Sequence, residues 1–240
     1  MKISIVIPNY NKEKYVLQCL RSCLNQTYKN IEVIFIDNES SDSSLETVTK
    51  YKEQNNANFI IDTAKNIYPK CWDECIELAE EKYISGDYYT IIGSDDVIHE
   101  TYIENVVKLL SINQPLFFQS SLVWFSEDKI IREVAYKYDN IEDFKSQLLT
   151  KCCVNTPTVF YKKDFKKNLQ LKTEPVKFSG ANDYALYCEI ADKNIIIENY
   201  EKWIGYYYRI NPEQATWQMH QSKINYDKII QRKWRQKWTN

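Results

Sequence analysis

Short apolar runs alternate with stretches of helical periodicity along the N-terminal part of the chain. The run KISIVIPNYN, at residues 2–11, is stopped by Pro8, and the following YVLQCLRSCLNQT spaces its apolar residues as one face of a helix does. The same scheme repeats with apolar runs at residues 31–36, 58–62 and 87–93. Strands alternating with helices predict right-handed crossovers and an α/β fold whose mostly parallel sheet is covered on both faces.

The spacing changes after Asp96. Helical patterns cover residues 99–113 and 141–150, and apolar runs typical of strands cover residues 116–125 and 129–138. A further strand is predicted within residues 154–165, and a helix begins near Asn182 and Asp183. Because no internal repeat or low-complexity linker interrupts the chain, we expect a single domain over residues 1–221 and a separate tail over residues 222–240.

Composition narrows the class of protein. The net charge is −2 over 240 residues, which gives the chain no field suited to a nucleic-acid backbone, so no nucleic-acid partner is expected. Seven cysteines without an N-terminal signal sequence favour reduced thiols in a cytoplasmic protein. No apolar run approaches the ~20 residues that a membrane span needs, so we expect a soluble protein or one attached only at a membrane surface.

Two cysteine pairs have the spacing of neighbours on a helix. Cys19 and Cys23, and likewise Cys71 and Cys75, are four residues apart on predicted helices, so each pair shares one helical face. Such a pair could hold zinc, but small buried apolar side chains are the favoured interpretation.

Polar residues follow all four of the first predicted strands. Ligands of open α/β sheets bind outside the carboxyl ends of the strands, so these positions are candidates for a binding site. One alternative is that each is only a loop residue or a helix cap. The residues are Asn9, Tyr10 and Asn11; Asp37 and Asn38; Asp62, Lys65 and Asn66; and Asp95 with Asp96.

Two common nucleotide-binding loops are absent from the sequence. Neither a G-x-G-x-x-G fingerprint nor a G-x-x-x-x-G-K-[ST] loop is present, which argues against a nicotinamide dehydrogenase and a phosphate-loop nucleotidase. A nucleotide bound here would need its phosphates neutralised in another way. A divalent cation held by Asp95 or Asp96 would do so, because Mg²⁺ and Mn²⁺ prefer carboxylates together with phosphate oxygens and water.

Five segments follow one another along the chain: ISIVIPNYN, VIFIDNESSDSS, YTIIGSDDVI, NDYALYCEIA and YYYRI. In this order and spacing they resemble the family-2 glycosyltransferases of the nucleotide-sugar-binding GT-A fold, and the resemblance covers roughly residues 1–215. It implies a Rossmann-like sheet with a C-terminal acceptor-side extension, divided into a nucleotide-sugar-binding half at residues 1–98 and an acceptor-binding half at residues 99–221. It also implies inverting transfer of a sugar from a nucleoside-diphosphate sugar to a hydroxyl of a glycan or lipid-linked acceptor, in bacterial surface polysaccharide biosynthesis. Uridine is the commonest nucleoside in the family.

The resemblance also implies roles for particular residues. Asp183 matches the general base, which accepts the proton of the attacking hydroxyl. Asp95 is the first choice as ligand of Mn²⁺ or Mg²⁺ and Asp96 the second, while Arg209 and His220 are candidates for a diphosphate contact. The nucleotide-binding residues implied are Pro8, Tyr10, Asp37, Asn38, Lys65, Asn66, Ser94 and Asp95.

Three departures from the family pattern leave other functions open. Gly93 stands where the first carboxylate of the metal motif is expected, Ile67 and Tyr68 replace a glycine-containing stretch, and Asn211 stands in place of a histidine. A non-catalytic nucleotide-sugar-binding or scaffold protein is therefore one alternative. A sugar nucleotidyltransferase is another, although the glycine- and arginine-rich loop expected after its first strand is missing.

The tail at residues 222–240 combines basic residues with two tryptophans. Trp234 and Trp238 are four residues apart and would be neighbours on a helix. The tail resembles a helix that lies on an anionic membrane, which would make the protein peripheral on the inner face of the cell membrane. The alternative is a terminal helix that packs its aromatic side chains on the domain.

Overall fold

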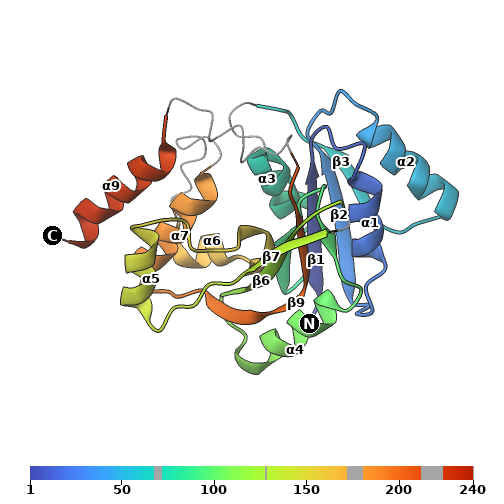
Figure 1. Ribbon diagram of the computed structural model, residues 1–240. Coiled ribbons are helices and arrows are strands. Elements are labelled where there is room, and N and C mark those ends of the chain that lie inside the picture. Colours follow the sequence, from blue (N-terminus) through green and yellow to red (C-terminus); the bar gives the residue numbers. More distant parts are fainter. Residues whose placement is uncertain (68–71, 128, 172–180, 212–223, 240) are drawn as a thin grey trace.

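The computed structural model describes residues 1–67, 72–127, 129–171, 181–211 and 224–239. Its described strands form one mixed sheet with helices on both faces (Figure 1). The strands lie in the order β3-β2-β1-β4-β8-β6-β9-β5, and β7 pairs with β6. The predicted α/β class is confirmed.

The N-terminal half contains the predicted alternation of strands and helices. Strands β1 to β4 pair in parallel, and residues such as Ile5 and Val6 of β1 are fully buried because helices cover both faces of the sheet. The elements are β1 (Ile3–Asn9), α1 (Val16–Leu24), β2 (Ile31–Asp37), α2 (Ser44–Asn55), β3 (Ile60–Thr63), α3 (Trp72–Lys82) and β4 (Tyr88–Ile91).

The C-terminal half is more mixed than the predicted sheet. β8 pairs antiparallel with β4 and β6, and β5 pairs antiparallel with β9, whereas β6 and β9 are parallel. Antiparallel pairs need no helical crossover, which explains why the alternation in the sequence ends here. The elements are β5 (Val97–Ile98), α4 (Tyr102–Asn113), β6 (Phe117–Ser126), β7 (Lys129–Val134), α5 (Ile141–Leu148), η1 (Thr156–Thr158), β8 (Phe160–Lys162), α6 (Phe165–Leu169), α7 (Asn182–Asp192), β9 (Glu198–Arg209) and α9 (Tyr226–Trp238).

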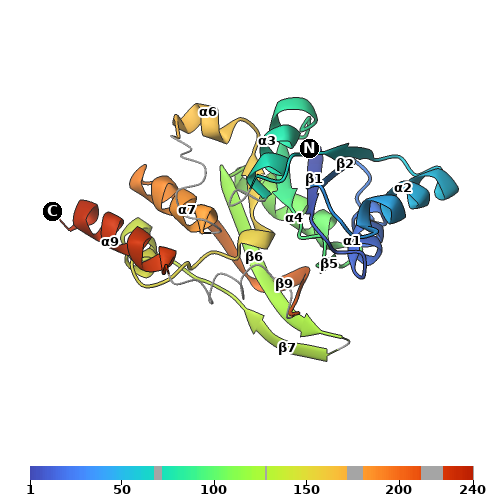
Figure 2. The ribbon, with the colours of Figure 1, turned by 90° about the horizontal axis from the view of Figure 1, so that it is seen from above.

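Two hydrophobic cores lie on opposite faces of the sheet. Side chains of α1, α2 and α4 pack on one face, and side chains of α3, α5, α7 and α9 pack on the other. Figure 2 shows α1 and α2 on one side of the molecule and α7 and α9 on the other. Cys19, Cys23 and Cys75 are fully buried in these cores, as the apolar interpretation predicts, while Cys71 lies outside the described residues.

Helix α9 packs on the domain through its aromatic side chains. Trp234 is 4 % exposed, and Trp238 donates its indole N–H to Asp192 Oδ1 of α7 at 3.1 Å. The exposed residues of α9 are largely basic, among them Lys228, Arg232 and Lys233. The tryptophans therefore behave as expected for a terminal helix that packs its aromatic side chains on the domain. Association of the tail with a membrane stays a prediction. The predicted boundary after residue 221 lies outside the described residues, and no helix within the described ranges is long and apolar enough to span a membrane.

Gly205 permits β9 to approach the start of α4. Its φ is +131°, and a Cβ built on it would lie 2.9 Å from His99 Cβ and 3.1 Å from Tyr102 Cβ. Gly205→Ala is therefore expected to lower the free energy of unfolding by about 1–3 kcal/mol, because the backbone is strained for any other residue and the neighbours must move. Urea denaturation measures this, with Ser111→Ala on the exposed face of α4 as control. Equal denaturation midpoints for the two variants would contradict the packing described.

Candidate active site

The carboxyl ends of β1 and β2 form a rigid polar corner. Asn9 and Asp37 are register partners, and Asn9 Nδ2 donates to Asp37 Oδ1 at 2.8 Å. Ser40 donates its backbone N–H to Asp37 Oδ2 at 2.8 Å and its hydroxyl to Oδ1 at 2.7 Å. Although Asp37 is fully buried, three donors hold its carboxylate in one orientation.

Two amide oxygens beside this carboxylate lack donors. Asn38 donates Nδ2 to the Lys65 carbonyl at 3.0 Å, which ties the loop after β2 to the loop after β3. Asn9 Oδ1 and Asn38 Oδ1 are buried, and within the described part of the chain neither accepts a hydrogen bond. Buried acceptors without partners are rare in folded proteins, so this corner is an unusual feature of the fold.

The other predicted nucleotide-binding residues lie around this corner. Pro8 is buried in β1, while Tyr10, just beyond β1, is 43 % exposed and presents its ring at the rim. Lys65 is exposed, and the backbone N–H of Asn66 donates to Glu39 Oε2 at 3.0 Å. Asp62 instead turns away and accepts a hydrogen bond from the Tyr83 hydroxyl at 2.6 Å. Asp37, Asn38, Tyr10 and the loop at Lys65 are thus brought together, and Asp62 is not.

Asp96 ties the loop after β4 to β9. Its Oδ1 accepts the backbone N–H of Arg209 at 2.8 Å, and its Oδ2 accepts the Tyr206 hydroxyl at 2.8 Å. Burial raises the pKa of Asp96 well above its usual value, and the neighbouring charge of Asp95 raises it further. Both carboxyl oxygens are thus engaged within the protein, so Asp96 acts mainly as a structural support for Asp95.

Asp95 is the carboxylate that meets cationic and amide groups. Its Oδ2 accepts from Asn211 Nδ2 at 2.9 Å and lies 3.7 Å from Lys12 Nζ. Its carbonyl accepts from Arg209 Nε at 2.6 Å, and the Arg209 guanidinium lies 4.7 Å from the ring centroid of Tyr15 and 4.4 Å from that of Phe125. Lys12 was missed in the sequence, where a lysine in a loop carries no distinguishing signal. Its charge here offsets the repulsion between Asp95 and Asp96.

The residues around Asp95 would offer a divalent cation few protein ligands. A Cβ at Gly93 would lie 3.0 Å from Asp96 Oδ2 and 3.3 Å from Asp95 Oδ1, so a side chain at this position would crowd both carboxylates and they would have to move by a few tenths of an ångström. Among the described residues, no group of three or more His, Cys, Asp or Glu side chains could hold a metal ion. A hard cation can nevertheless be held by one carboxylate together with phosphate oxygens and water, which is what Asp95 offers.

Asp183 lies in the first turn of α7. Its Oδ2 accepts the Thr156 hydroxyl at 2.6 Å, and its Oδ1 accepts the backbone N–H of Tyr184 at 2.7 Å. Burial of the carboxyl raises the pKa of Asp183, which Thr156 partly offsets and Asp227 of α9 reinforces. The preceding residue, Asn182, donates to Asp73 Oδ2 of α3 at 2.6 Å, which ties the start of α7 to the start of the helix after β3.

Two further predicted site residues have simpler outcomes. Ser94 is buried within the loop that carries Asp95. His220 lies outside the described residues, so a diphosphate contact from it stays a prediction. Ser40 and Thr156 were missed as site residues because serine and threonine are common in loops, and only the fold places them against Asp37 and Asp183.

The fold and the sequence both match known proteins. A family model described as Glycosyl transferase family 2 matches residues 4–186. The family match and the fold therefore define a glycosyltransferase of the GT-A type. The chain belongs to glycosyl transferase family 2.

Curated relatives include three bacterial proteins. The chain is 28% identical over 209 residues to an Escherichia coli protein named UDP-Glc:alpha-D-GlcNAc-diphosphoundecaprenol beta-1,3-glucosyltransferase WfaP, covering 87% of this chain and 77% of that protein. It is 28% identical over 156 residues to Glycosyltransferase GlyA of Streptococcus pneumoniae, covering 60% of this chain. It is 26% identical over 251 residues to the minor teichoic acid biosynthesis protein GgaB of Bacillus subtilis, covering 92% of this chain. The chain spans only 21% of GlyA and 24% of GgaB.

Two solved structures show the same fold. TarS 1–349 of S. aureus, in complex with UDP, has a TM-score of 0.67 and 20% identity, covering 89% of this chain and 62% of that chain. The mannosyltransferase PcManGT from Pyrobaculum calidifontis, in complex with GDP-Man and Mn²⁺, has a TM-score of 0.62 and 13% identity, covering 92% of this chain and 60% of that chain. The predicted GT-A fold is confirmed.

Proposed function

We propose that this protein transfers a sugar, with inversion, from a uridine diphosphate sugar to a hydroxyl of a glycan or lipid-linked acceptor. One observation carries the proposal. The polar corner at Asp37 and the carboxylate of Asp95 lie at the ends of neighbouring strands, and the buried carboxyl group of Asp183 lies at the start of α7. The first turn of α7 lies toward the same edge of the sheet as the ends of β1 and β2 (Figure 1). The complex of TarS with UDP and the name of WfaP support uridine as the nucleoside.

The donor's nucleoside would bind at the polar corner. The exposed Tyr10 ring offers a stacking face for the base, and the buried side chains of Asn9, Asp37 and Asn38 hold the corner beside it in place. Pro8 lies near the end of β1 beside this corner, and Lys65 and Asn66 border it. The diphosphate would then extend toward Asp95, where Lys12 and the loop supported by Arg209 lie.

A divalent cation bound by Asp95 and the donor's diphosphate would supply positive charge for the departing diphosphate. The chain's own residues supply the rest of the chemistry. Lys12 adds a second positive charge beside the leaving group, and Asp96 fixes the Asp95 loop against β9. Asp183 accepts the proton of the acceptor hydroxyl as that oxygen attacks the anomeric carbon from the side opposite the diphosphate, which inverts its configuration.

The names of two relatives support a proposal for the acceptor, and the basic face of α9 supports a proposal for the location. WfaP and GgaB are named for a lipid-linked acceptor and for teichoic acid biosynthesis, which supports a role in assembling a bacterial surface polysaccharide. We place the reaction in the cytoplasm, with the basic outer face of α9 against the inner face of the membrane. Exposed Lys228, Arg232 and Lys233 support that orientation through attraction to anionic headgroups.

Thermal-shift measurements with uridine and guanosine diphosphate sugars, with and without Mn²⁺, test the proposed function. A ligand that binds the native state raises its stability by mass action, so the donor should raise the melting temperature and Mn²⁺ should enlarge the increase. No increase with any of these donors would contradict the proposal.

The raised pKa of Asp183 predicts how stability and activity depend on pH. The pKa of Asp183 is higher in the folded protein than in the unfolded chain. The free energy of unfolding of the wild type should therefore decrease as pH rises from the ordinary aspartate pKa through the raised one. Asp183→Asn lacks this loss, so its stability relative to wild type should increase from acidic to neutral pH.

Wild-type activity should fall as pH drops through the raised pKa of Asp183, since the general base becomes protonated. Denaturation and initial rates across pH 3 to 8 measure both effects, and a parallel stability profile for the two proteins would contradict the assignment.

A further inference from the structure

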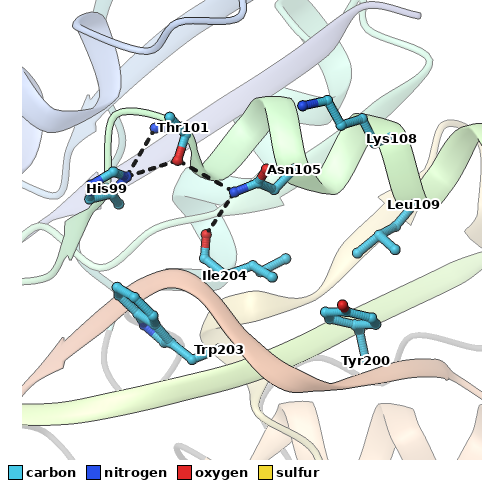
Figure 3. Close-up of a pocket in the computed structure, with 8 residues that line it drawn as sticks. All are labelled: His99, Thr101, Asn105, Lys108, Leu109, Tyr200, Trp203 and Ile204. Atoms are coloured by element: carbon cyan, nitrogen blue, oxygen red, sulfur yellow. Dashed lines mark hydrogen bonds between the residues drawn. The ribbon is translucent and has the colours of Figure 1, made fainter.

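A groove of about 380 Å³ lies between α4 and β9, away from the predicted catalytic residues. Figure 3 shows Tyr200 and Trp203 rising from β9 toward α4, with His99 and Thr101 at one end and Leu109 of α4 above Tyr200. We call it the α4–β9 groove. α4 packs on the face of the sheet opposite α7, the helix that carries Asp183. In the proposed function, the nucleoside binds at the Asp37 corner and Asp183 is the general base, so this groove has no assigned role.

Trp203, in the floor of the groove, is held in a fixed orientation. The Trp203 indole N–H donates to the Tyr206 carbonyl at 3.0 Å, and its ring packs edge-on against Tyr207 with centroids 5.1 Å apart. His99 contacts the same indole edge-on at 6.4 Å. Both Trp203 and Tyr200 remain partly exposed. A ligand would therefore meet at least one aromatic ring, that of Trp203, that needs little ordering on binding.

Hydrogen-bonding groups of both kinds flank these rings. His99 Nδ1 accepts the Thr101 backbone N–H at 3.3 Å and lies 2.8 Å from the Thr101 hydroxyl, so the neutral imidazole carries its proton on Nε2 and can donate it (Figure 3). Asn105 Nδ2 lies 3.4 Å from both Thr101 Oγ1 and the Ile204 carbonyl. Its Oδ1 makes no hydrogen bond within the described ranges and can accept one.

This combination matches the chemistry of a sugar ring. A pyranose has a flat C–H face that packs on an aromatic ring and a rim of hydroxyls that both donate and accept hydrogen bonds. A purely apolar ligand would leave His99 and Asn105 unsatisfied. A nucleotide would need a partner for its phosphate, and the nearby Lys108 is already 2.9 Å from Glu104 Oε1.

We propose that the α4–β9 groove is a saccharide-binding subsite for the glycan on which the protein acts, an inference that rests on the proposed function. Arg209 ends β9 in the predicted active site, six residues beyond Trp203, or about 20 Å along a strand. A sugar unit bound in the groove is therefore a different unit of the glycan from the one that carries the reacting hydroxyl. Holding a distant unit of the same polymer raises the effective concentration of its acceptor end near Asp183.

Indole N–H signals of the ¹⁵N-labelled full chain test the subsite. The chain has 6 tryptophans, and the signal missing from Trp203→Phe identifies Trp203. Cellotetraose, chitotetraose and maltotetraose are titrated to millimolar concentration. We expect a saturable shift of the Trp203 signal with at least one of them. Tyr200→Ala should weaken that binding about tenfold, whereas Tyr200→Phe, which keeps the ring, should retain it.

Two results would overturn the inference. One is a Trp203 signal that none of the three saccharides shifts. The other is a shift that follows protein concentration and not saccharide, which would make the groove a contact between copies of the chain. The donor-induced rise in the melting temperature of the wild type is measured separately. If donor raises the melting temperature and no saccharide shifts the Trp203 signal, the subsite proposal fails and the proposed function stands.

Discussion

Asp183→Asn is expected to reduce the transfer rate by about 10²- to 10⁴-fold, the range typical of a lost general base. The acceptor hydroxyl is a poor nucleophile until its proton is taken, and the amide of asparagine cannot take it. The amide oxygen of this variant can still accept the Thr156 hydroxyl, as Asp183 Oδ2 does, so the first turn of α7 should be preserved. Donor binding, measured by thermal shift, should therefore be retained while the rate falls.

Asp192→Asn is the matched control for this variant. Asp192 ends the same helix and pairs with Lys237 and Trp238 of α9, far from the first turn. Its loss should leave the transfer rate near wild type, although α9 becomes less firmly held. Equal rates for wild type and Asp183→Asn would leave the base assignment without support.

Asp95→Asn is expected to reduce the rate by about a thousandfold, or about 4 kcal/mol, because charge stabilisation of the departing diphosphate is lost with the cation. An amide oxygen binds a hard cation far more weakly than a carboxylate does. The enlargement of the donor thermal shift by Mn²⁺ should also disappear. Initial rates against metal concentration measure the effect, with Asp87→Asn, at an exposed position before β4, as control.

Asp96→Asn separates the two neighbouring carboxylates. Because both oxygens of Asp96 accept hydrogen bonds from β9, we expect this variant to lose stability as well as activity. Asp95→Asn should lose activity with little change in melting temperature in the absence of ligand. A metal response that survives Asp95→Asn but not Asp96→Asn would reverse the assignment.

The parts of the fold that sequence reasoning reached are those with local signals. Buried apolar runs and helical periodicity located β1 to β4 and the helices between them. The mixed C-terminal half was not foreseen, because β8 enters between β4 and β6 through pairings between distant segments, which leave no periodic trace in the sequence. The contact of Trp238 with Asp192 of α7 joins distant segments in the same way.

The candidate site shows the same division. Asp37, Asp95 and Asp183 could be selected because they follow strands or open a helix within a recognisable motif. Their supporting partners could not: Asp96 meets Tyr206, and Asp183 meets Thr156, across long separations in sequence. At Gly93 the sequence reveals the missing carboxylate, and only the structure reveals that a side chain there would crowd the carboxylates of Asp95 and Asp96.

The most direct test of catalysis is the configuration of the sugar released from the donor. The chain is incubated with α-linked uridine diphosphate sugars and Mg²⁺, and the first product is followed by proton NMR. Inverting transfer to water predicts UDP together with the β-anomer, formed only with metal and not by Asp183→Asn. An α-anomer formed first, or a donor that binds without any UDP release, would contradict the account.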